Sequence, residues 1–220
     1  LQELIKNKLT TVQRLELSSD YITEGHALKG VLKADMENIR ATMEKIDYNT
    51  FEDVVNNIFT AKRIYIIGLR SSMALAEFLG FYLNIILQNV KTVGYGISDI
   101  FEQMINVGEG DLVIGIGFPR YASRTIDALA FAQDRGARVV AVTDSFLSPL
   151  ATRADYALIA QSNMASFVDS LVAPLSVINA LIIAVGMREK ENISSTFNSL
   201  EEIWQEYNVY SYNNRNFGDD

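Results

Sequence analysis

The middle of the chain alternates between short apolar runs and longer stretches in which apolar residues recur every three or four positions. The short runs are continuous rather than alternating with polar residues, which is typical of strands covered on both faces of a sheet. They span residues 63–67, 91–94, 111–116, 138–143 and 156–160. Most of the stretches between them, notably 73–88 and 125–135, have helical spacing. This alternation predicts an α/β fold, a three-layer α/β/α sandwich with a five-stranded parallel sheet.

The pattern ahead of the first strand is helical. Apolar residues recur at helical spacing in residues 1–15 and again in residues 28–46. A further helix is expected over residues 50–59, where Thr50 and Asp53 have the spacing of a helix cap. The sandwich should therefore be preceded by N-terminal helices.

One uncharged run, residues 170–187, approaches the length of a membrane-spanning helix. Pro174, Ser176, Asn179 and Gly186 lower its hydrophobicity. We therefore expect no membrane contact, and interpret the run as a helix buried on most sides, in part against a second copy of the chain.

Composition narrows the possible functions. The chain has 220 residues, 49% of them hydrophobic, which suits one α/β domain with additional helices. Its formal charge of −8 argues against nucleic-acid binding by this chain, because phosphate backbones attract clustered Lys and Arg. The absence of cysteine and the single histidine, His26, exclude disulfides, thiolate metal sites and His-rich metal sites. We expect no metal, no cofactor and a cytoplasmic location.

Two loops carry the most informative chemistry. Residues 63–76, RIYIIGLRSSMALA, pass from a strand through Ser71 and Ser72 directly into a helix. Residues 111–130, DLVIGIGFPRYASRTIDALA, repeat this order of strand, loop and helix. Open α/β sheets bind ligands at the carboxyl ends of their strands, and helix N-termini at that edge favour anions. The sequence therefore predicts an anion-binding cleft between the two loops.

Together with a third segment, these loops resemble a known family. The third segment, GARVVAVTDSFLSPLATRADYALIA at residues 136–160, joins a strand end, a loop, a capped helix and the next strand. The array is similar to the SIS (sugar isomerase) domain, and more narrowly to the effector domain of RpiR-family bacterial transcriptional regulators. The resemblance covers residues 28–188.

The resemblance implies a domain order and a role. Residues 1–27 would be the connector after a helix-turn-helix domain missing from this chain, residues 28–188 the SIS domain, and residues 189–220 a C-terminal helix and tail. The role would be that of a non-catalytic, ligand-sensing domain of a transcriptional regulator. Its partners would be a small anionic metabolite such as a phosphosugar and further copies of itself, in a homodimer or homotetramer. DNA would bind only through the absent N-terminal domain.

The second loop departs from the family pattern. SIS domains contact phosphate through serines after the first strand, which Ser71 and Ser72 match, and through an S-x-S-G-x-T loop after the third strand. The six positions from Gly117 to Ala122 read G-F-P-R-Y-A, so three hydroxyl donors are lost. The chain resembles a subgroup of RpiR-like regulators with an F-P-R-Y-S loop. The guanidinium of Arg120 could hold an anion in place of the lost hydroxyls.

We predict a set of ligand-binding residues and no catalytic residue. The set is Ser71, Ser72, Gly117, Arg120, Tyr121 and Ser123. The alternative for the two adjacent serines is that one of them caps a helix. The alternative for the arginine is a solvated or ion-paired loop residue, and the tyrosine either stacks on a ligand or packs beneath the loop.

Other titratable residues are weaker candidates. His26 lies in the helical N-terminal segment and is not tied to either loop. Asp144 and Asp155 are expected to be local caps rather than general bases. Asp169 either faces the cleft or supplies negative charge at a helix N-terminus.

Two other functions stay open. Aldose–ketose isomerisation needs a base, for which Glu77 and Glu102 are the remaining candidates, so a phosphosugar isomerase is one alternative. The other alternative is an assembly domain that binds no ligand and dimerises through residues 170–187.

Overall fold

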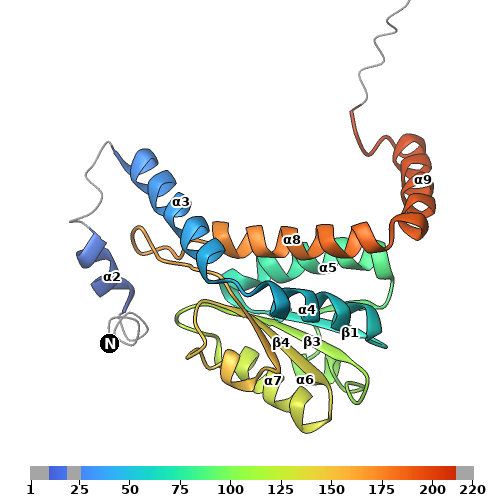
Figure 1. Ribbon diagram of the computed structural model, residues 1–220, viewed down its shortest axis with the longest axis horizontal. Coiled ribbons are helices and arrows are strands. Elements are labelled where there is room, and N and C mark those ends of the chain that lie inside the picture. The colour runs from blue at the N-terminus through green and yellow to red at the C-terminus, as the bar shows by residue number, and fades with distance from the viewer. Residues whose placement is uncertain (1–9, 19–25, 212–220) are drawn as a thin grey trace, which may run out of the picture.

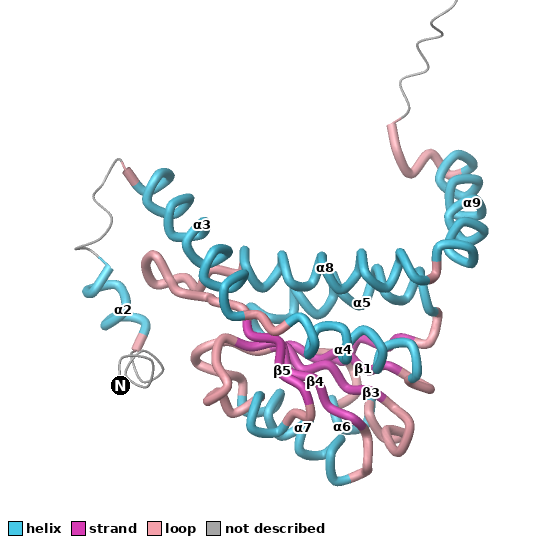
Figure 2. Tube along the Cα trace, in the orientation of Figure 1, coloured by secondary structure: helices cyan, strands magenta, loops and turns pink. Residues whose placement is uncertain are grey.

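The computed structural model describes residues 10–18 and 26–211, and it places a parallel sheet between two layers of helices (Figure 1, Figure 2). The strands are β1 (Ile64–Gly68), β2 (Val90–Val93), β3 (Leu112–Ile116), β4 (Arg138–Thr143) and β5 (Tyr156–Ile159). Their order in the sheet is β2-β1-β3-β4-β5, and every neighbouring pair is parallel. The predicted α/β/α sandwich with five parallel strands is confirmed.

The helices form unequal layers. They are α2 (Thr11–Ser18), α3 (Ala27–Lys45), α4 (Tyr48–Thr60), α5 (Met73–Leu87), α6 (Ile100–Gln103), α7 (Ser123–Asp134), α8 (Val172–Arg188) and α9 (Lys190–Glu206), with 3-10 helices η1 (Arg70–Ser72) and η2 (Ala151–Arg153). One layer contains α4, α5 and α8, with α3 packed on α8, and the other contains α6 and α7. The predicted helix over residues 1–15 lies largely outside the described residues.

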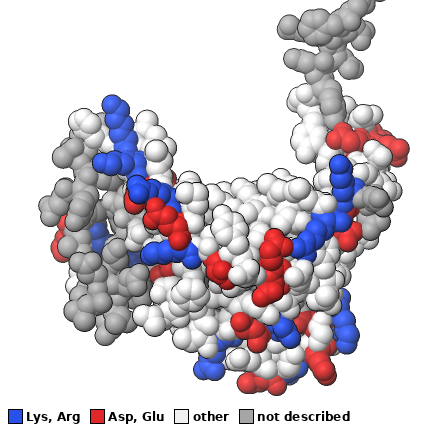
Figure 3. All heavy atoms as spheres, viewed as in Figure 1, with Lys and Arg blue, Asp and Glu red and all other residues white. Residues whose placement is uncertain are grey.

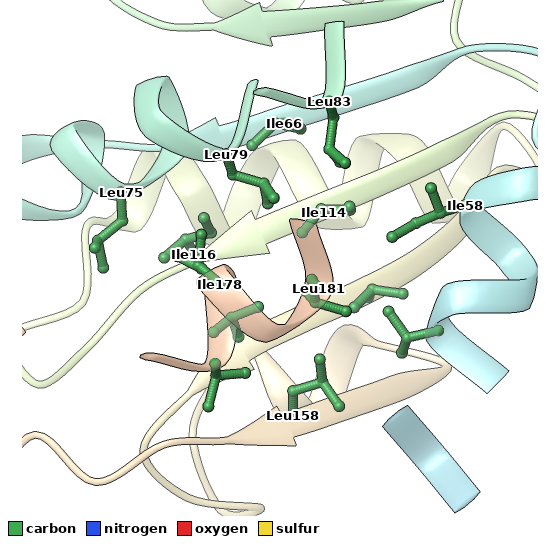
Figure 4. Packing of buried hydrophobic residues seen from close by; sticks show 14 of the residues in the cluster. Ile58, Ile66, Leu75, Leu79, Leu83, Ile114, Ile116, Leu158, Ile178 and Leu181 are labelled. Carbon is green, nitrogen blue, oxygen red and sulfur yellow. The ribbon is translucent and has the colours of Figure 1, made fainter. Parts of the chain in front are cut away.

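The strands divide the core into two clusters because successive side chains of a strand point to opposite faces. In β1, Ile64 and Ile66 join the cluster beneath α4, α5 and α8, whereas Tyr65 and Ile67 join the cluster beneath α6 and α7. Figure 4 shows the first cluster, in which α5 and α8 pack over the strands. Every residue of β1 and β3 is buried, as the continuous apolar runs predict.

The uncharged run of residues 170–187 forms most of α8. Its inner face is buried, through Ala173, Pro174, Val177, Ile178, Leu181 and Val185. Ile183 and Met187 are exposed. Within residues 10–18 and 26–211, no single helix is long and apolar enough to cross a membrane, and α8 and α9 pass that test only as a pair bent by 108°. Beyond this bend, α9 projects from the body of the domain (Figure 1).

The start of α4 differs from the prediction. The cap is Asp47 rather than Thr50, because the Asp47 carboxylate accepts hydrogen bonds from the Thr50 hydroxyl at 2.7 Å and the Thr50 N–H at 2.8 Å. These bonds hold the pKa of Asp47 below its ordinary value. A carboxylate also interacts favourably with the helix dipole, so α4 begins before the apolar periodicity does.

Candidate ligand-binding site

The order in which strands are added to the sheet reverses between β1 and β3. β2 follows β1 in sequence and pairs with one of its edges, and β3 then pairs with the other edge. The helices that follow these two strands, α5 and α7, lie on opposite faces of the sheet. Their connecting loops therefore diverge at the carboxyl ends of the strands and leave a crevice, the usual ligand position in open α/β sheets. A cleft of about 500 Å³ lies there.

The cleft brings together every residue that the sequence analysis nominated for ligand binding. Ser71 and Ser72 come from η1, Gly117, Arg120 and Tyr121 from the β3–α7 loop, and Ser123 from the first turn of α7. Several residues that were not nominated also line it: Arg14, Arg70, Thr125, Phe167 and Asp169 among them.

The loop after β1 turns sharply because of a glycine. A Cβ at Gly68 would approach the carbonyl oxygen of Ser72 to 2.6 Å, so only glycine permits this turn. Ser72 is buried at the N-cap position of α5, yet its side chain makes no capping hydrogen bond. The helix-cap alternative is therefore wrong for Ser72, and its hydroxyl lines the cleft instead.

Two arginines flank the cleft in left-handed backbone conformation. Arg70 has φ 59° in the loop after β1, and Arg120 has φ 63° in the loop after β3. Residues other than glycine rarely adopt this conformation, which costs about 1–3 kcal/mol and is concentrated at ligand sites. With Arg14, the described lining holds three arginines against one carboxylate, Asp169, in a chain of net charge −8. The cleft is thus a positive region of an acidic protein.

Tyr121 is held in place by Asp144. Its hydroxyl donates to Asp144 Oδ1 at 2.8 Å, and the Thr143 hydroxyl donates to the same oxygen at 3.2 Å. The ring packs on the core beneath α7, as the second interpretation states, and Tyr121 also lines the cleft; stacking on a ligand stays a prediction. The Asp144 carboxylate fixes the β3–α7 loop to the end of β4, and the expectation that Asp144 is a local cap stays a prediction.

Gly117 contributes backbone rather than a free donor. Its N–H already donates to the carbonyl oxygen of Val142 at 3.1 Å, which extends the sheet. A Cβ at this position would approach Leu150 Cδ2 to 2.7 Å. A side chain here would force Leu150 to shift, and the glycine gives the cleft a wall without a side chain.

The first turn of α7 restores hydroxyls that the loop has lost. Ser123 is exposed, and Thr125 is buried at 1% exposure with no hydrogen-bond partner for Oγ1 in the described part of the chain. Buried polar atoms are usually hydrogen-bonded, so an unpaired hydroxyl in the wall of a cleft is a candidate ligand donor. Thr125 was not among the predicted residues, which end at Ser123. The available signal was a second hydroxyl residue in the first turn of α7.

Asp169 faces the cleft, which was the first of the two alternatives given for it; the other was a charge at a helix N-terminus. It lies ahead of α8 and pairs with Arg14 of α2, whose Nη1 is 2.8 Å from Asp169 Oδ1. The two residues are 155 positions apart in the sequence. Nothing in the apolar pattern of the N-terminal segment could indicate that its arginine reaches the cleft.

The candidate bases lie elsewhere. His26 is exposed at the N-cap position of α3, and Glu77 is exposed on α5. Glu102 accepts a hydrogen bond from the Asp99 N–H in a capping box. None of the three lines the cleft, and its lining within the described chain includes no histidine and no glutamate.

Comparisons with known proteins agree with this geometry. The model of the SIS domain family matches residues 57–184. An HTH-type transcriptional regulator of Haemophilus influenzae is 28% identical over 182 residues, which are 81% of this chain and 62% of the regulator. The chain therefore spans about three fifths of the length of this relative.

Two solved structures have a similar fold. The sugar isomerase domain of an RpiR transcription factor from Sphaerobacter thermophilus has a TM-score of 0.77 and 30% identity, over 80% of this chain and 99% of that one. The Vibrio vulnificus NanR protein, complexed with ManNAc-6P, has a TM-score of 0.71 and 19% identity, over 93% of this chain and 78% of that one. The chain belongs to the SIS domain family, among the sugar isomerase domains of RpiR-type transcription factors.

Proposed function

We propose that this chain is the ligand-sensing effector domain of a transcriptional regulator, and that its ligand is a small phosphorylated sugar. The observation that carries the proposal is the cleft between the β1 and β3 loops, where Arg14, Arg70 and Arg120 gather in an acidic chain. Guanidinium groups recognise phosphate through paired, charge-assisted hydrogen bonds. The N-termini of α5 and α7 open on the same cleft and add favourable dipoles.

Two further observations support a sugar phosphate rather than a bare anion. The cleft of about 500 Å³ is within the range of small-molecule sites, so it has room for a sugar beside a phosphate. The hydroxyls of Ser71, Ser123 and Thr125 can exchange hydrogen bonds with sugar hydroxyls. The NanR protein, which shares this fold, is complexed with ManNAc-6P.

We propose a sensor rather than an isomerase. Moving a proton between adjacent carbons needs a positioned base. The described lining of the cleft offers only the Asp169 carboxylate, which is paired with Arg14. The chain should therefore bind phosphorylated aldoses or ketoses without interconverting them. Chromatography of the sugars after incubation with the chain measures this. Turnover would instead favour the isomerase alternative.

DNA binding belongs, in this proposal, to a part of the whole protein outside this chain. The chain spans 62% of the H. influenzae HTH-type regulator, which leaves room in such a protein for a DNA-binding domain. The net charge of −8 opposes DNA binding by the chain alone. Fluorescence anisotropy with duplex DNA should show no binding at physiological salt. Such a regulator would act in the cytoplasm.

Self-association is also part of the proposal. A groove of about 510 Å³ between α5, α8 and α9 is lined mainly by apolar side chains, and Ile183 and Met187 beside it are 60% and 74% exposed. The surface along α8 is largely uncharged (Figure 3). Exposed apolar patches of this kind mark interfaces. Light scattering should show a dimer or larger, weakened by Ile183→Glu and unaffected by Ile105→Glu, a control at a 65% exposed isoleucine elsewhere.

The proposal is tested by thermal unfolding with ManNAc-6P, with a broad panel of other sugar phosphates, and with the unphosphorylated counterpart of each sugar. A ligand at a hundredfold excess over its Kd stabilises the folded state by about 2.7 kcal/mol, or about 5–10 °C in Tm for a chain of this size. We expect such a shift with at least one sugar phosphate and none with its unphosphorylated counterpart. A shift with neither class across the panel would contradict the proposal.

A further inference from the structure

Arg14 of α2 enters the cleft from outside the sandwich. The residue is only 3% exposed, and its Nη1 donates to Asp169 Oδ1 at 2.8 Å. Its Nε, also buried, has no hydrogen-bond partner among residues 10–18 and 26–211. A guanidinium has five N–H donors in a rigid fork. Asp169 therefore accepts hydrogen bonds from only some of the N–H donors of Arg14. This buried cation lines the same cleft as Arg120.

The partner of Arg14 is anchored to the domain. Asp169 belongs to the segment between β5 and α8, and α3 holds this segment at several points. The Asn38 amide donates to the Asn163 carbonyl at 2.8 Å, and the Ser170 hydroxyl donates to Asp35 at 2.6 Å. The anchored carboxylate thus positions the Arg14 guanidinium at the cleft.

We infer that α2 is a wall of the anion site, and that the phosphate of a bound ligand is shared between the β1 and β3 loops and Arg14. The inference rests on the proposed function and adds to it a residue outside the region matched by the family model, residues 57–184. A buried, partly satisfied guanidinium gains more from an added anion than a solvated one does, because its desolvation has already occurred.

Ligand binding and the docking of α2 are then coupled. If the anion binds more tightly when Arg14 is in the cleft, occupancy of the cleft stabilises the docked position of α2 by the same factor. α2 precedes α3 and the sandwich in the chain, so occupancy is transmitted towards the N-terminus. On this inference, the docked position of α2 is the feature that ligand occupancy stabilises.

A simpler role for Arg14 has to be separated from this one. Arg14 also neutralises Asp169, and without it the bare carboxylate would repel any anion in the cleft. Loss of affinity in Arg14→Gln alone fits both roles. In an Asp169→Asn background the repulsion is absent, so only direct contact between Arg14 and the anion predicts a further loss.

The experiment titrates inorganic phosphate into the ¹⁵N-labelled chain and follows NMR shifts of the cleft residues. Arg14→Gln in the Asp169→Asn background should weaken phosphate binding about ten- to a hundredfold relative to Asp169→Asn alone. The matched control is Arg40→Gln, on the exposed Arg40–Glu44 pair of α3, and it should leave the affinity unchanged. Equal affinities with and without Arg14 in the Asp169→Asn background would overturn the inference.

Hydrogen exchange supplies the second readout. Phosphate should slow amide exchange in residues 11–18 of the unmodified chain but not in the Arg14→Gln variant. Binding without any change in α2 exchange would also overturn the inference, while leaving the proposed function intact. Failure of the unmodified chain to bind phosphate or any sugar phosphate would contradict the proposed function itself, and the inference with it.

Discussion

The two ends of the sheet use charge in opposite ways. At the amino ends of the strands, Asp111 is fully buried and accepts hydrogen bonds from Arg63 Nη2 at 2.8 Å and from the Gly108 N–H at 3.0 Å. The Asp155 carboxylate accepts from the Val139 N–H at 2.7 Å, which joins β4 to the start of β5. At the carboxyl ends, positive side chains line an open cleft instead. Charge at the first end holds the fold together, whereas charge at the second end lines the cleft proposed for a ligand.

The left-handed positions show the same contrast. Next to the amino ends, the residues with positive φ are Gly110 at 86°, Gly136 at 80° and, ahead of β2, Gln88 at 61°. Beside the cleft they are Arg70 and Arg120. Glycine adopts this conformation without strain, and arginine does not. Two of the three turns at the amino ends thus avoid strain through glycine, whereas both positions beside the cleft hold an arginine in the strained conformation.

The helices also differ in how they begin. α4 has Asp47 as its cap, and α6 has a capping box between Asp99 and Glu102. α3, α8 and α9 have no side-chain cap, and neither do the two helices that open on the cleft, α5 and α7. Their first N–H groups are therefore not satisfied by a side chain at the cap position, which suits helices that receive an anion.

The largest expected effect is a loss of stability at the amino ends of the strands. Asp111→Asn removes the charge that pairs with Arg63 and leaves a buried amide with a donor facing the guanidinium. We expect the free energy of unfolding to fall by about 2–4 kcal/mol. Denaturant unfolding measures this loss. Sugar phosphate affinity of the folded protein should not change, and a large loss of affinity would contradict the separation of the two ends.

The second expected effect is a loss of ligand affinity at the carboxyl ends of the strands. Arg120→Ala should weaken the ligand by about 1.5–3 kcal/mol, the contribution of a charge-assisted hydrogen bond, while stability barely moves. Arg120→Lys should restore only part of the affinity, because lysine keeps the charge without the planar fork. Calorimetric titration of the variants measures both. Unchanged affinity in Arg120→Ala would leave Arg14, Arg70 and the hydroxyl side chains of the cleft as the phosphate contacts.

A comparison of Arg120→Gly with Arg120→Ala measures the cost of the left-handed backbone at this position. Both variants lack the guanidinium, so both should lose the same affinity. The glycine variant should be more stable by about 1 kcal/mol, because alanine keeps the left-handed penalty and glycine does not. Thermal melts of the two variants test this difference. Equal melting temperatures would mean that the Arg120 backbone is not strained.

The smallest effect concerns the support of the loop. Tyr121→Phe removes the hydrogen bond to Asp144 Oδ1 and keeps the ring in its packing. We expect a loss of about 0.5–1.5 kcal/mol in stability, typical of one intramolecular hydrogen bond. Ligand affinity should fall less than in Arg120→Ala. An affinity loss larger than that of Arg120→Ala would indicate that Tyr121 itself binds the ligand.

Much of the architecture could be predicted because it depends on local pattern. Buried parallel strands are continuous apolar runs, so β1 and β3 stand out, and the loops after them follow at once. Parallel pairing then brings Ser71 and Arg120 to one edge of the sheet without further information. The cap of α4 was misplaced by three residues because both Asp47 and Thr50 suit a helix start, and only their mutual hydrogen bonds decide between them.

What could not be predicted depends on contacts between distant segments. Arg14 reaches the cleft only because Asp169 is held in place by α3, over a sequence separation of 155 residues. The hydrogen bond between Tyr121 and Asp144 needs β3 and β4 to be neighbours in a known register. The left-handed backbone of Arg70 leaves no trace in the sequence, because glycine is the residue that normally marks it.

The central claim is that the carboxyl end of the sheet binds the phosphate of a sugar phosphate. The most direct test is calorimetric titration of the unmodified chain with the best phosphosugar of the thermal screen and with the same sugar lacking its phosphate. Several charge-assisted hydrogen bonds predict that the phosphate contributes at least about 3 kcal/mol, or a hundredfold or more in Kd. Equal affinity for the two sugars would contradict the claim.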